Sequence, residues 1–326
     1  MKNIKILGIE TSCDETCASV VVNGYFVLSN KIASSAEVQS NFGGVVPEIA
    51  SRKHIEYISY VTDEALKTAN TPLNEIDAIA VTTGPGLIGS LLVGVNFAKA
   101  LSFGAKKPLV AVNHIEGHIA SIFLEHDIKP PFNALVVSGG HTILYEVLDY
   151  EEYKIIGKTL DDAVGEAYDK VARLLGLGYP GGPAVDKLAQ KGKAVIEFPK
   201  PKSKEENFDF SYSGLKSSVI NYVNSCSMKG LEINKEDICA SFQKAAIDVL
   251  VEKTLKFQKL SEFHKRPLAI VGGVASNSYL REKFEGSHIP SIQYCTDNAA
   301  MIAARGYYSY LNRKFEKMNL NGRSVL

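Results

Sequence analysis

Two histidines with a helical spacing are the residues of this chain whose types and positions first suggest chemistry. They are His114 and His118 in Asn-His-Ile-Glu-Gly-His, where the pattern predicts a short helix. Residues four positions apart share a helical face, so both imidazoles can reach one metal ion; the alternative is a pair of surface histidines. Glu116 does not follow the first histidine and points to a different face, so this is not the His-Glu-x-x-His pattern of zinc proteases.

A third metal ligand is expected elsewhere in the chain, because two side chains rarely hold a catalytic metal. Asp297 is the candidate, since it lies where a strand-like segment meets the last predicted helix. Its alternative role is that of a helix N-cap. Two histidines and one carboxylate that leave coordination positions open suit Fe²⁺ or Zn²⁺.

Glycine-rich turns suggest a second kind of site. Ser138-Gly139-Gly140-His141-Thr142 lies between two predicted strands, where glycines let backbone amides approach an anion; the alternative is an ordinary hairpin turn. Tyr179-Pro180-Gly181-Gly182-Pro183 and Val271-Gly272-Gly273-Val274 repeat glycines at predicted helix starts. Three such loops favour a nucleotide, and we expect an adenylate.

A literal dinucleotide-binding motif, Gly84-Pro85-Gly86-Leu87-Ile88-Gly89, also follows a predicted strand. The acidic residue that a Rossmann site needs further along is missing, because Lys106-Lys107 occupies that region. Close packing between helix and strand is therefore the preferred explanation of these glycines.

Acidic pairs are the remaining candidates for acid, base or metal-positioning roles. Asp14 and Glu15 stand in the first predicted turn, and Asp161 and Asp162 follow the third strand of the second half. Each of them alone is more often a turn residue.

Composition limits the class of protein. Lys plus Arg and Asp plus Glu both number 36 in 326 residues, so any contact with RNA must be local or assisted by a partner. The five cysteines form no Cys-x-x-Cys pair, which fits reduced thiols in a cytoplasmic protein. The apolar stretch 87–103 is expected to fall short of a membrane span, and the charged stretch 198–208 is expected to be a solvated loop.

Strands and helices alternate along the chain in two halves of similar pattern. The first half opens with strands at 4–9 and 20–22 and an Asn23-Gly24 hairpin, and the second with strands at 134–137, 143–148 and 153–156. Further helices are expected at 55–66, up to 97, at 165–175, 183–191 and 238–249, and from 297. Further strands are expected at 76–81, 109–112 and 268–271.

The predicted fold class is therefore α/β, with two similar domains, each a mixed sheet flanked by helices, and a ligand cleft between them. We place the domains at 1–129 and 130–326, and expect the last helix to pack back on the first domain.

Several motifs in order resemble the bacterial TsaD family of tRNA N6-adenosine threonylcarbamoyltransferases, once called O-sialoglycoprotein endopeptidases. They are 8–16, 113–118, 137–142, 165–183 and 295–298, and the resemblance spans nearly the whole chain. It implies the actin-like ATPase (ribonuclease H-like) fold. It also implies transfer of threonylcarbamoyl from threonylcarbamoyl-AMP to the exocyclic amine of the adenosine 3′ of the anticodon, in tRNAs that read codons beginning with A, with release of AMP.

The resemblance also assigns residues and partners. It places metal ligands at His114, His118 and Asp297. It places adenylate-binding residues, where ATP, ADP or AMP can also bind, at Val137, Ser138, Gly139, Gly140, His141, Asp169, Gly182, Asp186 and Asn277. We expect Asp14 and Glu15 to be catalytic. The implied partners are tRNA, an inactive TsaB-like paralogue and a small TsaE-like P-loop ATPase, with no membrane. One departure from the family is that Leu280 to Cys295 is shorter than usual.

Two rival functions share the predicted fold. A small-molecule kinase would use the phosphate loops but has no need of paired histidines on a helix. A non-catalytic ATP-binding scaffold would explain the neutral charge but not the metal ligands.

Overall fold

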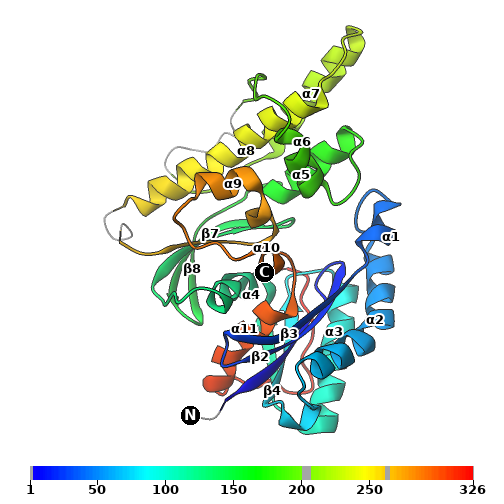
Figure 1. Ribbon diagram of the computed structural model, residues 1–326, viewed down its shortest axis with the longest axis vertical. Helices are drawn as coiled ribbons and strands as arrows, with labels where there is room; N and C mark the ends of the chain where they lie inside the picture. The colour runs from blue at the N-terminus through cyan, green and yellow to red at the C-terminus, as the bar shows by residue number, and fades with distance from the viewer. Residues whose placement is uncertain (1–2, 200–206, 261–264, 326) are drawn as a thin grey trace. The chain divides into compact units, whose positions relative to one another are not determined.

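The computed structural model describes residues 3–199, 207–260 and 265–325 and divides the chain into two compact units (Figure 1). The first unit is formed by 1–128 with 290–326, and the second by 129–289. The sequence predicts domains at 1–129 and 130–326, with the last helix packed back on the first domain. The segment 290–326, which was assigned to the second domain, belongs instead to the first unit, because its helix packs on the first unit's sheet. Residues 200–206 of the predicted charged loop lie outside the described residues.

The first unit is built on a five-stranded mixed sheet in the order β3-β2-β1-β4-β5. Its strands are β1 (Lys5–Glu10), β2 (Glu15–Val22), β3 (Phe26–Ser34), β4 (Ala78–Gly84) and β5 (Leu109–Asn113). β1, β2 and β3 form an antiparallel meander, and β4 and β5 extend it in parallel from β1. Asn23 and Gly24 have φ angles of 54° and 80°, which confirms the predicted hairpin turn.

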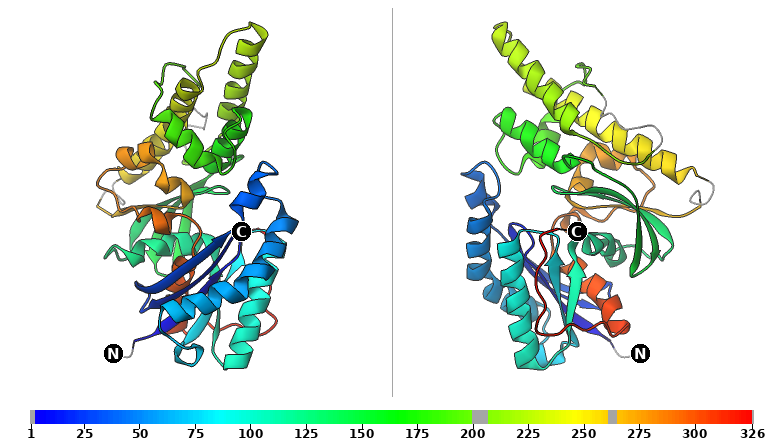
Figure 2. Two further views of the ribbon diagram at one scale, coloured as in Figure 1. Left: turned by 45° about the vertical axis from the view of Figure 1, so that its right-hand side comes forward. Right: turned by 180° about the vertical axis from the view of Figure 1, so that it is seen from behind.

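Helices cover both faces of this sheet, as Figure 2 shows. α2 (Pro47–Thr68) and α3 (Ile88–Ala105) lie on one face and α11 (Ala299–Leu311) on the other. The unit also contains α1 (Ala36–Ser40), η1 (Leu73–Glu75), α4 (His114–Ala120), η2 (Ser121–Leu124) and α10 (Ile292–Cys295). Strand side chains alternate between the two faces. Those packed with α2 and α3 include Leu7, Ile9, Val20, Ile79 and Val81. Those packed with α11 include Ile6, Val21, Ala78, Ala80, Val110 and Val112.

α11 lies unusually close to the sheet. A Cβ atom on Gly8 of β1 would clash with the Ala299 carbonyl oxygen, and one on Gly306 of α11 would lie 2.5 Å from the Ala80 Cβ. Glycine at both positions therefore permits backbone-level packing. The residues that follow α11 return across the unit, where the Glu316 amide donates to the Leu109 carbonyl and the Arg323 amide to the Thr83 carbonyl.

The second unit repeats the meander with one parallel strand added, in the order β8-β7-β6-β9. Its strands are β6 (Phe132–Val137), β7 (Thr142–Asp149), β8 (Glu152–Lys158) and β9 (Leu268–Val271). Its helices are α5 (Val164–Leu174), α6 (Gly181–Ala189), α7 (Ser213–Met228), α8 (Lys235–Gln258), η3 (Gly273–Ser276) and α9 (Ser278–Lys283). α8 is anchored by fully buried Ile238, Phe242 and Ala246, and the Phe242 ring meets Tyr168 of α5 edge-on at 4.9 Å between centroids.

Among the elements that the sequence misjudged or missed are β2, α2 and α7. β2 begins at Glu15, well before the predicted Val20, because the polar turn is shorter than its composition suggests. α2 begins at Pro47, and Ile55, predicted on its buried face, is 65% exposed, whereas Ile58 and Val61 are buried as expected. α7, rich in serine and asparagine, was not predicted.

α3 is the one described helix that is long and apolar enough to cross a membrane by length and composition alone. It has 18 residues with a mean hydropathy of 1.4, so the expectation that this stretch falls short of a span was wrong. The finding is weak, because core helices pass the same test, and α3 buries Leu91, Val95 and Ala98 in the first unit.

Candidate metal centre and glycine-rich loops

α4 carries the two histidines directly after β5, the parallel strand at one edge of the sheet. β5 ends at Asn113, whose Oδ1 accepts hydrogen bonds from the Ile115 amide at 2.8 Å and the Glu116 amide at 3.3 Å. This N-cap fixes where the helix begins. His114 and His118 are both buried and share one face of α4, with ring centroids 4.7 Å apart.

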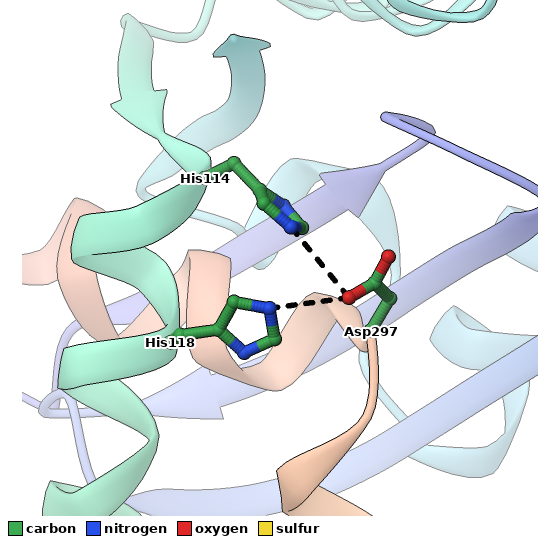
Figure 3. A group of neighbouring side chains, drawn as sticks. All are labelled: His114, His118 and Asp297. Atoms are coloured by element: carbon green, nitrogen blue, oxygen red, sulfur yellow. Dashed lines mark ion pairs between the residues drawn. The ribbon is translucent and has the colours of Figure 1, made fainter. Parts of the chain in front are cut away.

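Asp297 reaches the same point from the start of α11. Its Oδ1 lies 3.2 Å from His118 Nε2 and 3.6 Å from His114 Nε2 (Figure 3). The alternative N-cap role belongs to the next residue, because Asn298 Oδ1 accepts the Met301 amide at 3.0 Å. The structure therefore brings the three predicted ligands together, with one donor atom from each inside a 4.8 Å cluster.

The geometry of this group fits a metal ion. Neither ring nitrogen of the fully buried His118 has a hydrogen-bond partner among the described residues, although Asp297 Oδ1 is only 3.2 Å from Nε2. Ligand distances of about 2.0–2.2 Å to one ion place neighbouring donor atoms roughly 3.0–3.6 Å apart. The two separations from Asp297 Oδ1, 3.2 and 3.6 Å, fall in that range, and a buried nitrogen without a partner is otherwise costly.

His114 is oriented by a carboxylate that the sequence did not single out. Its Nδ1 lies 3.0 Å from Glu10 Oε2 and 3.2 Å from Ser12 Oγ. Glu10 is completely buried at the end of β1 and also accepts a hydrogen bond from Thr82 Oγ1. A proton on Nδ1 directed at Glu10 leaves Nε2 as the free donor atom toward Asp297. A glutamate closing a buried strand was the signal that could have revealed it.

Neighbouring charges determine the direction in which the pKa values of His114 and Glu10 shift. Burial alone lowers the pKa of His114, but the negative charges of Glu10 and Asp297 outweigh burial and raise it to about 9. Burial alone would raise the pKa of Glu10, but the positive charge and hydrogen bond of His114 hold it below its ordinary value. Protons and a metal ion therefore compete for His114.

Asp14 and Glu15 lie at the end of a turn that is held from several sides. Three carbonyl oxygens of this turn accept hydrogen bonds from other elements. The Ser12 carbonyl accepts from the Leu87 amide, the Cys13 carbonyl pairs with His54 Nε2, and the Asp14 carbonyl accepts from Ser35. Burial, followed by the hydrogen bond and charge of Asp14, raises the pKa of Glu15 well above its usual value.

The carboxylate of Glu116, which lies between the two histidines in the sequence, forms an ion pair with an arginine of another helix. Its Oε2 lies 2.9 Å from Arg305 Nε and 2.8 Å from Arg305 Nη2 of α11. A metalloprotease base would have to face the metal, whereas this carboxylate faces a neighbouring helix. The expectation that it points to a different face from the histidines agrees with this contact.

All nine predicted adenylate-binding residues lie in the second unit, four of them in the turn between β6 and β7. The Ser138 amide donates to the His141 carbonyl at 2.8 Å, and the His141 amide donates to Ser138 Oγ at 3.1 Å. Gly139 and Gly140 are exposed, and a Cβ on either would meet no atom within 4 Å. This turn is open to an anion.

Two of the other predicted adenylate-binding residues, Asp186 and Asn277, share a hydrogen-bond partner that was not predicted. Gln243 of α8 donates from Nε2 to Asp186 Oδ1 at 3.2 Å, and its Oε1 accepts from Asn277 Nδ2 at 2.7 Å. Asp169 Oδ1 accepts the Gly181 amide at 2.8 Å, next to Gly182 at the start of α6. Gln243 is a polar residue inside an apolar helical face, which is a signal for such a role.

Two other candidate motifs are structural. A Cβ atom on Gly86 would lie 2.6 Å from the Ser12 carbonyl oxygen, and one on Gly89 would clash with Ser51 Oγ. Close packing therefore explains these two glycines of the motif. Asp161 accepts hydrogen bonds from the segment 211–213, and Asp162 pairs with Lys170 at 2.7 Å and with Lys216.

Comparison with known proteins places these features in a family context. A family model described as "TsaD: tRNA N6-adenosine threonylcarbamoyltransferase" matches residues 26–304. The tRNA N6-adenosine threonylcarbamoyltransferase of Clostridium perfringens (strain SM101) is 55% identical over 331 residues, which cover 98% of this chain and 97% of that protein. That of Clostridium novyi (strain NT) is 54% identical, with 98% and 96% covered.

Solved structures of distant sequence share the fold. HypF of T. kodakarensis superimposes with a TM-score of 0.61 at 15% identity, over 98% of this chain and 49% of that one. Component A of the (R)-2-hydroxyglutaryl-CoA dehydratase of Acidaminococcus fermentans gives 0.55 at 14% identity, over 94% and 99%. These likenesses confirm the predicted actin-like ATPase fold.

Proposed function

Because the chain belongs to the TsaD family of tRNA N6-adenosine threonylcarbamoyltransferases, we propose that it transfers threonylcarbamoyl from threonylcarbamoyl-AMP to tRNA and releases AMP. The acceptor is the exocyclic amine of the adenosine 3′ of the anticodon, in tRNAs that read codons beginning with A. The family match over most of the chain is the observation that carries this proposal. The buried three-ligand group in the first unit supports it.

His114, His118 and Asp297 would hold one Fe²⁺ or Zn²⁺ ion through two imidazole nitrogens and one carboxylate oxygen. Such an ion would supply a Lewis acid able to polarise the threonylcarbamoyl carbonyl. Glu10 contributes by keeping the His114 proton on Nδ1, so that Nε2 is presented as a ligand.

Two neighbouring carboxyls, those of Asp14 and Glu15, are the candidates for the proton transfer in this reaction. The adenine amine is a weak nucleophile and must lose a proton as the new carbon–nitrogen bond forms, so a carboxylate base is needed. Asp14 takes that proton in our proposal. Burial and the neighbouring Asp14 raise the pKa of Glu15 well above its usual value, so the base role falls to Asp14 and not to Glu15.

The second unit would bind the adenylate half of the donor. The exposed Gly139 and Gly140 leave their backbone amides free to approach the phosphate, with Val137, Ser138 and His141 forming the rest of the turn. Asp169, Gly182, Asp186 and Asn277 supply the nucleoside contacts, and Gln243 holds Asp186 and Asn277 in position.

We further propose a cytoplasmic location and a shared tRNA-binding surface. A chain with 36 basic and 36 acidic residues has no overall attraction for RNA. A TsaB-like inactive paralogue and a TsaE-like P-loop ATPase are the partners that the family resemblance implies.

Nucleoside mass spectrometry tests the proposal directly. Unmodified tRNA is incubated with the protein, the candidate partners and threonylcarbamoyl-AMP, beside a His114→Ala variant. We expect threonylcarbamoyladenosine from the wild type and none from the variant. No product from the wild type, with the donor verified intact, would favour a small-molecule kinase or an ATP-binding scaffold instead.

A further inference from the structure

We propose that the ion pair between Glu116 and Arg305 is a positioning device that sets the orientation of α4 and thereby places His118 for the metal. This inference rests on the proposed metal site, and it assigns a role to the central glutamate of the His-Ile-Glu-Gly-His sequence that the proposed chemistry leaves unused. This glutamate ties the ligand helix to α11.

The two histidines differ in how their rings are held. His114 has Glu10 and Ser12 as hydrogen-bond partners at 3.0 and 3.2 Å. Neither ring nitrogen of His118 has such a partner among the residues that the structure describes. The direction of the His118 ring therefore depends on the position of the helix backbone that carries it.

α4 cannot hold that position by itself. It has seven residues, too few for a helix to be stable without tertiary contacts. At 100° per residue, His118 lies about 40° around the helix from His114, whereas Glu116 lies about 160° from His118, on the opposite face. A contact at Glu116 therefore resists rotation of the helix about its own axis.

The required precision makes this contact consequential. With an imidazole nitrogen roughly 6 Å from the helix axis, a rotation of about 10° moves it by about 1 Å. Metal–ligand distances tolerate only about 0.2 Å. Glu116 is held by two nitrogens of Arg305, which is 6% exposed and further fixed by a 2.9 Å bond from Nη1 to Ser309 Oγ.

α11 is a suitable anchor because it also carries Asp297 at its start. Gly8 and Gly306 let it pack closely on β1 and β4, where added Cβ atoms would clash. Beside the ion pair, a Cβ on Gly117 would lie 2.7 Å from Ile302 Cδ1, which shows how closely α4 and α11 approach. One helix thus supplies the third ligand and sets the rotation of the helix that bears the other two.

The test is a Co²⁺ titration of the metal-free protein followed by visible absorption, with thermal unfolding of the same metal-free samples. Glu116→Gln and Arg305→Met should each weaken Co²⁺ binding by about 10-fold or more and change the band pattern. The matched control is Glu75→Gln, which breaks the 2.7 Å pair with Lys5 in the same unit and should leave binding within about 2-fold.

A double variant separates positioning from stability. Glu116→Met with Arg305→Met replaces a partly buried pair by apolar side chains, which often restores stability. We expect its unfolding temperature to approach that of the wild type while Co²⁺ binding stays about 10-fold weaker. Wild-type affinity in this double variant, or in Glu116→Gln, would overturn the inference. A wild-type protein that binds no Co²⁺ would instead contradict the metal site of the proposed function.

Discussion

The turn after β1 and the turn after β6 occupy corresponding places in two similar meanders, yet one is closed and the other open. In the first unit, Glu10 at the end of β1 is fully buried, and the carbonyl oxygens of Ser12, Cys13 and Asp14 are bound by other elements. In the second unit, Gly139 and Gly140 are exposed with no neighbour near a Cβ position. The same topology can therefore hold a ligand-orienting carboxylate or present free backbone amides.

The physical difference lies in what each turn has to fix. A metal ligand must stay within a few tenths of an ångström, which requires partners that are themselves fixed. An anion held by backbone amides requires space, which side chains would fill. Five substitutions, tested in four experiments, would break or sharpen this contrast.

The largest effect is expected for His118→Ala in the closed region. Loss of one of three ligands should abolish stable metal retention and lower turnover by at least roughly 100-fold, more than outer-shell changes usually do. Metal content after gel filtration and the rate of threonylcarbamoyladenosine formation measure this. His126→Ala, in the same unit, should keep both properties, and a His118→Ala protein that retains metal and turnover would contradict the assignment.

Glu10→Gln should follow, with a metal affinity about 10–100-fold weaker. The amide can no longer hold the proton on His114 Nδ1 by charge, so the free nitrogen is presented less often. Chelator competition measures the affinity. The exposed Glu48→Gln is the control, and equal affinities for the two variants would show that Glu10 does not orient His114.

A pair of glycine substitutions tests whether the turn after β1 is closely packed and the turn after β6 is open. Gly86→Ala places a Cβ 2.6 Å from the Ser12 carbonyl oxygen, and overpacking of this kind costs about 1–3 kcal/mol. For a unit of this size, each kcal/mol lowers the unfolding temperature by about 2–4 °C. Gly140→Ala should leave that temperature unchanged and raise the KM for threonylcarbamoyl-AMP. Calorimetry measures the unfolding temperature, and steady-state kinetics measure the KM. A Gly140→Ala variant with a lowered unfolding temperature would show that this turn is not open.

The smallest effect concerns Glu15→Gln and pH. The raised pKa of Glu15 means that the folded state binds a proton that the unfolded state releases, so stability falls as pH rises above about 4.5. The glutamine variant lacks this proton. Its unfolding temperature should exceed that of the wild type by about 2 °C at pH 8 and match it at pH 4. Glu37→Gln, an exposed control, should show no difference at either pH, and identical wild-type and Glu15→Gln curves would contradict the raised pKa.

Local patterns were sufficient for most of the fold and for the ligand types. The spacing of His114 and His118, the Asn23-Gly24 turn and the strand at 268–271 all depend on neighbouring residues, and the structure reproduces them. The exposure of Ile55 and the early start of β2 depend on packing that a local pattern does not contain. α7 was missed because its serines and asparagines have no clear apolar period.

The sequence by itself determined the family, the α/β class and the residue types at the candidate site, because these follow from motifs and from hydrophobic periodicity. Only the tertiary structure decided that Asp297 meets the histidines, that Glu10 orients His114, and that Glu116 pairs with Arg305. Each of these contacts joins residues more than 100 positions apart in the chain. Side chains so distant in sequence are brought together by the packing of β1, α4 and α11, which no local pattern records.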